Sequence, residues 1–228
     1  MRARPRALNK SDLMRVIVAS NDWCKGRSFS ALRTRALFAL AVGSGLRLKE
    51  CCALNLSQLL DRTGTKWTLR STCYLRAPQA KGRRAGKRGA WSSAGVFVLT
   101  RAAQRALRSY LREAQRRGWL EIPGKVDEPL FITIKGKGAR AANHHERLSR
   151  RSAQHSWDLL QSRAQLPEHY GFHCLRHTAL TRFADACKGD VFKVAAFGRV
   201  GLSTALIYVH NSPQRLAELA ELASTTSA

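Results

Sequence analysis

Three side chains suited to phosphate ester chemistry lie close together in the segment GFHCLRHTALTRF. His173, Arg176 and His177 stand at positions i, i+3 and i+4, so a helix would present two imidazoles and a guanidinium on one face. The pattern is a poor metal site, because it lacks the glutamate of an HExxH motif and Arg176 would place a positive charge beside the cation. We therefore expect no metal here. Taken alone, the pattern fits a surface helix with satisfied histidines equally well.

A second group of interest lies in the segment SGLRLKECCALNLSQL. It predicts a tight turn at Gly45 and a helix that starts near Arg47, with Glu50 one turn further on the same face. Glu50 then either buttresses Arg47 or is an ordinary exposed helix charge. Arginines such as Arg47 and Arg176 suit the oxygens of a phosphate better than lysines do, because the rigid guanidinium fork can donate two charge-assisted hydrogen bonds.

The overall charge indicates a polyanionic partner. The chain has 40 Lys+Arg against 15 Asp+Glu, a net charge of +25 and a pI near 11.2. The basic residues are spread through apparently folded segments, and no apolar run approaches the roughly 20 residues of a membrane span, so double-stranded DNA is favoured over a membrane. The six cysteines form no CxxC pair, which indicates neither a disulfide framework nor a zinc site. The N-terminal MRARPRALNK lacks the pattern of a secretory signal, so we expect a cytoplasmic, nucleoid-associated protein.

The chemistry-bearing residues require helices to position them, and apolar spacing predicts several. Thr100 and Ser212 stand where helix N-caps are expected, and Gly43 stands where the second helix would end. Tyr208 falls within a late apolar helix. The predicted helices cover residues 9–19, 30–43, 100–118, a stretch after 149, 173–187, 191–196, a stretch around 208, and 213–223.

Strand patterns occur between the helices. WTLRSTCYLR and GVFVLT are typical of strands, PLFITI of a further short strand, and the glycine-broken basic run KGRRAGKRG between the first two of an exposed hairpin or loop. The fold expected is therefore mainly α with a small antiparallel β-sheet (α+β). We expect one domain over residues 1–228, with a basic arm at 1–7, a C-terminal helix or tail at 212–228, and no separate N-terminal domain.

The order of these motifs resembles the catalytic domain of the tyrosine recombinase (phage integrase) family, from about Leu8 to His210. GLRLKE, a lysine-rich hairpin between strands, HCLRH and a tyrosine in GLSTALIYVH follow one another as in that family. The resemblance implies a site-specific DNA recombinase or integrase. Tyr208 would attack the phosphodiester, giving a 3′-phosphotyrosyl link and a free 5′-hydroxyl, without ATP, metal or other cofactor. Arg47 and Arg176 would clamp the phosphate as its nonbridging oxygens gain charge under attack. His173 would exchange a proton with the phenol or bond a phosphoryl oxygen, with His177 beside it.

The family places a lysine on the hairpin as the general acid for the leaving 5′-oxygen. Lys81 is our first choice and Lys87 its rival, because one sequence does not fix the register of the hairpin. The remaining basic residues would track the DNA backbone or stay solvated, and Lys87 joins them if Lys81 is the acid. They are Arg83, Arg84 and Arg88.

One position departs from the family pattern. Arg199 stands where the family usually carries histidine or tryptophan; it can donate to a phosphoryl oxygen, but its proton is effectively never released. The resemblance also implies a homo-multimer on DNA, a tetramer, since recombination joins two duplexes. Two alternatives stay open: a type IB topoisomerase-like nicking and closing enzyme, and a catalytically impaired DNA-binding regulator. The DNA site, and integration as opposed to excision, inversion or resolution, are not encoded in these motifs.

Overall fold

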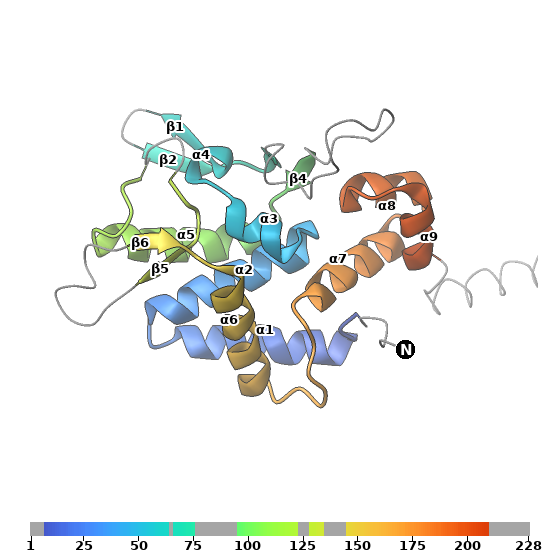
Figure 1. The fold of residues 1–228 in the computed structure, drawn as a ribbon, viewed down its shortest axis with the longest axis horizontal. Coiled ribbons are helices and arrows are strands. Elements are labelled where there is room, and N and C mark those ends of the chain that lie inside the picture. Colours follow the sequence, from blue (N-terminus) through green and yellow to red (C-terminus); the bar gives the residue numbers. More distant parts are fainter. Residues whose placement is uncertain (1–6, 64–65, 76–94, 123–127, 135–144, 210–228) are drawn as a thin grey trace, which may run out of the picture.

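Helices make up most of the computed structural model, which describes residues 7–63, 66–75, 95–122, 128–134 and 145–209. Figure 1 shows helices α8 and α9 at the right of the molecule and strands β1, β2, β5 and β6 at the left. The helices are α1 (Lys10–Cys24), α2 (Phe29–Ser44), α3 (Leu48–Ala53), α4 (Leu56–Leu59), α5 (Arg101–Arg116), α6 (Arg150–Arg163), α7 (His173–Ala186), α8 (Val191–Gly198) and α9 (Leu202–Val209).

Side-chain caps fix where several helices begin. Asn9 accepts a hydrogen bond from the backbone N–H of Asp12 at 2.7 Å and starts α1, which continues to Cys24, beyond the predicted end at residue 19. Thr100 and Ser149 cap α5 and α6 in the same way, so the predicted starts of both helices are confirmed.

The predicted end of the second helix was wrong by two residues. Gly45, at φ 63°, is the residue that takes the left-handed conformation and ends α2, whereas Gly43 lies inside the helix. Gly43 serves close packing instead, because a Cβ there would lie 2.8 Å from Oγ1 of Thr100, the N-cap of α5. The predicted turn at Gly45 and helix start at Arg47 are confirmed, with Arg47 as the N-cap of α3.

The strands form three separate antiparallel pairs within the described residues, in place of a single sheet. The predicted strand WTLRSTCYLR divides at residues 70–71 between two of these pairs. The pairs are β1 (Leu60–Thr63) with β2 (Lys66–Leu69), β3 (Thr72–Tyr74) with β4 (Val96–Val98), and β5 (Ile132–Ile134) with β6 (His145–Arg147). The β3–β4 pairing confirms that strands flank the basic run.

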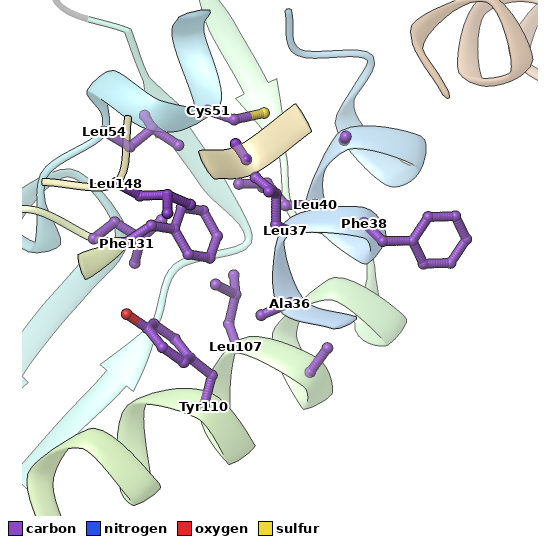
Figure 2. Packing of buried hydrophobic residues seen from close by; sticks show 14 of the residues in the cluster. Ala36, Leu37, Phe38, Leu40, Cys51, Leu54, Leu107, Tyr110, Phe131 and Leu148 are labelled. Carbon is purple, nitrogen blue, oxygen red and sulfur yellow. The ribbon is translucent and has the colours of Figure 1, made fainter. Parts of the chain in front are cut away.

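Two hydrophobic clusters hold the molecule together. The larger one joins α2 to α5 and α6, where Leu37, Leu107, Tyr110 and Phe131 converge as Figure 2 shows. The smaller one gathers the C-terminal half of α7 with α8 and α9 and includes Tyr208. Helix α7 contributes to both clusters, so it connects the main body to the unit that carries the tyrosine.

The length and composition of the described helices were compared with those of a membrane-spanning helix. No single one is long and apolar enough to cross a bilayer, and α8 with α9 passes such a test only as a pair bent by 112°.

Candidate active site

Arg47 is fixed at the start of α3 by Glu50. One carboxylate oxygen accepts the backbone N–H of Arg47 at 2.8 Å, and the other accepts its guanidinium at 2.9 Å. The side chain of Glu50 is 1% exposed and that of Arg47 is 24% exposed. Glu50 is therefore buried against Arg47, as a buttress would be, and is not an exposed helix charge. Arg47 keeps an accessible face for a ligand.

Arg176 is buried in the first turn of α7, and backbone carbonyls of two other segments orient it. One terminal nitrogen donates to the carbonyl of Gly45 and the other to the carbonyl of Gly198. These two bonds use two of the five N–H groups of a guanidinium. Arg176 thus joins the turn before α3 to the end of α8, with three N–H groups not used by these bonds.

The two histidines of the motif lie on the same side of α7 as predicted, in different surroundings. His173 is exposed, and its ring lies 4.8 Å from that of His177, centroid to centroid. His177 lies inward, 5.5 Å from the ring of Tyr208, and its Nε2 is buried without a partner among the described atoms. Burial, followed by the nearby His173 and Arg176, lowers the pKa of His177 to about 4, so the ring is neutral at pH 7.

Tyr208 is buried on α9, in the smaller hydrophobic cluster. Burial raises the pKa of its phenol, while the positive charges of Arg176 and Arg47 act in the opposite direction. The phenol therefore lies within the field of the two predicted phosphate-binding arginines, which favour its ionised form.

The side chain of Arg199 is buried. The residue ends α8 at φ 51° and ψ 50°, with a side chain that is 5% exposed. Its guanidinium donates to the carbonyl of Phe197 at 3.0 Å and to that of Gly45 at 3.2 Å, and approaches Glu50 at 3.8 Å.

Three guanidiniums therefore gather around the buried carboxylate of Glu50. Burial, followed by the charges of Arg47 and Arg199, lowers the pKa of Arg176 to about 10. Burial also lowers the pKa of Arg199. Such a cluster carries excess positive charge, and an oxyanion placed between Arg47 and Arg176 would relieve it. The arrangement is suited to binding one phosphate group beside a phenol.

Sequence reasoning missed the backbone carbonyls that hold this cluster. Those of Gly45 and Gly198 accept from Arg176, and every residue carries a carbonyl, so residue types gave no signal. Among the described residues, no three His, Cys, Asp or Glu side chains gather as metal ligands would. Five residues predicted to act in catalysis or DNA binding lie outside the described residues: Lys81, Arg83, Arg84, Lys87 and Arg88.

Comparison with known proteins agrees with this geometry. A model described as the phage integrase family matches residues 6–215, most of the chain. The chain belongs to the phage integrase family. Its curated relatives include tyrosine recombinase XerC of Pelotomaculum thermopropionicum, which is 28% identical over 187 residues, 81% of this chain and 52% of that protein. XerC of Escherichia coli O1:K1 / APEC is 26% identical over 197 residues, 85% of this chain and 53% of that protein.

The chain spans about half the length of these curated relatives. Among solved structures, XerA recombinase matches with a TM-score of 0.65 at 19% identity, covering 97% of this chain and 65% of that one. XerH recombinase in a post-cleavage complex with palindromic difH DNA matches with a TM-score of 0.63 at 21% identity, covering 96% and 54%. At these identities the likeness establishes that this phage integrase family member has the fold of those recombinases.

Proposed function

We propose that this chain is the catalytic unit of a site-specific DNA recombinase that cleaves and rejoins DNA through a 3′-phosphotyrosyl intermediate. The observation that carries the proposal is the position of the buried Tyr208, whose ring lies 5.5 Å from that of His177 in the HxxRH motif and within the field of the Arg176 and Arg47 charges. A buried tyrosine with a purely structural role has no need of a cluster of arginines near it. Family membership supports the same reading.

In the proposed step, the phenolic oxygen of Tyr208 attacks the phosphorus and the bond to the 5′-oxygen breaks. Arg47 and the N–H groups of Arg176 not bound to backbone would neutralise the charge that develops on the nonbridging oxygens. His173, the exposed histidine of the motif, would bond a phosphoryl oxygen or take the phenolic proton. The new ester retains the energy of the broken one, so rejoining requires only attack by a 5′-hydroxyl.

The leaving 5′-oxygen requires a proton, which we assign to Lys81 or Lys87. Both lie in the basic run between strands β3 and β4, and the pairing of these strands supports the proposed hairpin. The neighbouring Arg83, Arg84 and Arg88 would contact DNA phosphates, each contact contributing to a strong salt dependence of binding.

Double-stranded DNA is the proposed substrate, and the working form is proposed to be a homo-tetramer on DNA. The XerH protein to which this fold is similar was captured on its own DNA substrate. The net charge of +25 suits a phosphate backbone. On the same grounds we propose that the protein acts at the nucleoid, in the cytoplasm.

A groove between α1, α2, α5 and α7 supports self-association. It encloses about 1360 Å³, with an apolar floor that includes Leu13, Ile17, Phe38 and Phe183 and a rim that includes Arg105, Arg112 and Arg182. Residues 213–223, PQRLAELAELA, combine leucines at helical spacing with Glu218 and Glu221, which complement that rim. If this segment joins neighbouring protomers, a chain ending at residue 211 should bind DNA and fail to form multimers in sedimentation experiments.

Two other activities use parts of the same site. A type IB topoisomerase-like enzyme would relax a supercoiled plasmid without exchanging strands, whereas a recombinase would exchange the flanks of two DNA sites. Incubating the chain with a plasmid that bears paired sites from its genomic neighbourhood separates the two. A DNA-binding regulator, favoured by the arginine at position 199, would produce neither product and would form no covalent adduct.

A further inference from the structure

Arg199 adopts a backbone conformation that carries a cost for any residue with a Cβ. Its φ of 51° and ψ of 50° fall in the left-handed region, and its backbone N–H closes the end of α8. A left-handed residue at a helix end is most often glycine. The interactions of the Arg199 side chain must therefore offset this cost.

The guanidinium of Arg199 connects two segments that are far apart in the sequence. One terminal nitrogen donates to the carbonyl of Phe197, in the last turn of α8. The other donates to the carbonyls of Ser44 at 3.5 Å and Gly45 at 3.2 Å, at the end of α2. A planar fork is suited to such a link because its two arms hold a fixed angle.

Charge reinforces the link. Oε2 of Glu50 lies 3.8 Å from Arg199, and the same carboxylate binds Arg47. Glu50 opposes the effect of burial on the pKa of Arg199 and so favours the charged guanidinium. Arg47 and Arg199 therefore share one buried carboxylate.

The same contacts leave Arg199 poorly placed to bind DNA directly. Its side chain is 5% exposed, whereas that of Arg47 is 24% exposed. To reach a phosphate on the surface, Arg199 would have to give up its bonds to Gly45 and Phe197, and of these two carbonyls only that of Gly45 would keep another donor, Arg176.

We propose that Arg199 is a positioning residue: it holds the end of α8 against the turn between α2 and α3 and thereby sets Tyr208 relative to Arg47. Helix α9, which carries Tyr208, begins at Leu202, three residues after Arg199. A shift at Arg199 is therefore transmitted to the tyrosine along a very short connection. This inference rests on the proposed function, in which Tyr208 attacks a phosphate bound by Arg47.

Hydrogen exchange of the full chain tests the link without any DNA. Arg199→Met keeps an apolar stem, and Arg199→Lys keeps the charge but loses the two-armed fork. In both variants the amides of α9 and of residues 45–47 should exchange at least about tenfold faster than in the wild type, with α5 unchanged. Arg151→Met, at an exposed arginine on α6, is the matched control. Unchanged exchange in α9, or equally faster exchange in α5, would overturn the proposal.

Single-turnover adduct formation on a nicked duplex that the wild type cleaves tests the chemical consequence. Arg199→Met should lower the rate at saturating DNA by about 100-fold, because a small misplacement of the nucleophile is sufficient. The DNA concentration for half-saturation should stay within about twofold of the wild-type value.

A duplex with a neutral methylphosphonate at the cleaved position then separates positioning from charge neutralisation. The neutral group needs no charge neutralisation, so it should restore much of the rate of adduct formation in Arg47→Ala. The rate of Arg199→Met should remain low on the same duplex. Relief of Arg199→Met would show that Arg199 binds the phosphate and would overturn the proposal. If the wild type forms no adduct on any duplex, the proposed function fails, while the exchange experiment still decides the role of Arg199.

Discussion

Arg176 and Arg199 donate hydrogen bonds to the same backbone oxygen, the carbonyl of Gly45. That carbonyl lies two residues before Arg47, so a single turn sets the relative positions of three guanidiniums. The turn depends on glycine, because Gly45 has a φ of 63° and a Cβ there would lie 3.0 Å from a methyl carbon of Leu180.

Gly45→Ala should therefore lower both stability and activity. The left-handed backbone costs an alanine about 1–2 kcal/mol. Crowding against Leu180 should add a further 1–3 kcal/mol or so in the free energy of unfolding, measured by urea denaturation. Gly118→Ala is the control, because Gly118 has a similar φ of 68° and open space around it. Equal losses in the two variants would show that the packing of the turn is unimportant.

Glu50→Gln should destabilise the protein by about 3 kcal/mol, because it removes the negative charge beside Arg47 and Arg199 and leaves their charges uncompensated. The amide keeps nearly the same shape, so charge is the main change. Asp22→Asn breaks an exposed ion pair with Lys25 at the same i,i+3 spacing and should leave denaturant unfolding unchanged. A Glu50→Gln protein as stable as the wild type would argue against a charge-balanced cluster.

The depressed pKa of His177 predicts a dependence of stability on pH. Between about pH 6.5 and pH 4, the unfolded state binds a proton at this position and the folded state does not, so the free energy of unfolding falls as the pH falls. Because solvent reaches part of the ring, we expect His177 to contribute about 1–2 kcal/mol of this loss. Denaturation curves of the wild type and His177→Gln at pH 7 and pH 4.5 measure it. Parallel losses in the two proteins would contradict the low pKa.

A lysine of the basic run between β3 and β4 should act as the general acid that protonates the leaving 5′-oxygen. Lys81→Ala should slow DNA cleavage by about 100-fold or more, and replacing the bridging 5′-oxygen by sulfur should restore the rate, since a thiolate leaves without protonation. DNA binding should change little. If the sulfur substrate restores the cleavage rate of Lys87→Ala and not that of Lys81→Ala, Lys87 is the general acid. If it restores the rate of neither variant, neither lysine is the general acid.

Local patterns in the sequence accounted for most helices and for the side chains of the site. Arg47, His173, Arg176 and Tyr208 were predicted from type and order, and the structure brings Arg47, Arg176 and Tyr208 into one electrostatic environment. The HxxRH helix followed from spacing alone, because i, i+3 and i+4 share a face.

Long-range relationships could not be predicted in this way. The division of the strand at residues 70–71, the separate strand pairs and the bonds of Arg199 to Phe197 and Gly45 depend on which segments meet in three dimensions. Helix α2 continues beyond Gly43 because close packing against Thr100 outweighs the tendency of glycine to end a helix. A glycine near a helix end is consistent with either role when only the sequence is considered.

Tyr208→Phe tests the central claim most directly. The change removes only the hydroxyl and keeps the ring in its buried cluster, so fold and DNA affinity should be retained. Tyr74→Phe, at a side chain that is 63% exposed on β3, is the control. On a nicked suicide duplex from the genomic neighbourhood, the wild type and Tyr74→Phe should accumulate a protease-sensitive adduct joined through a 3′-phosphate, and Tyr208→Phe should form none. An adduct in Tyr208→Phe would contradict the assignment of the nucleophile.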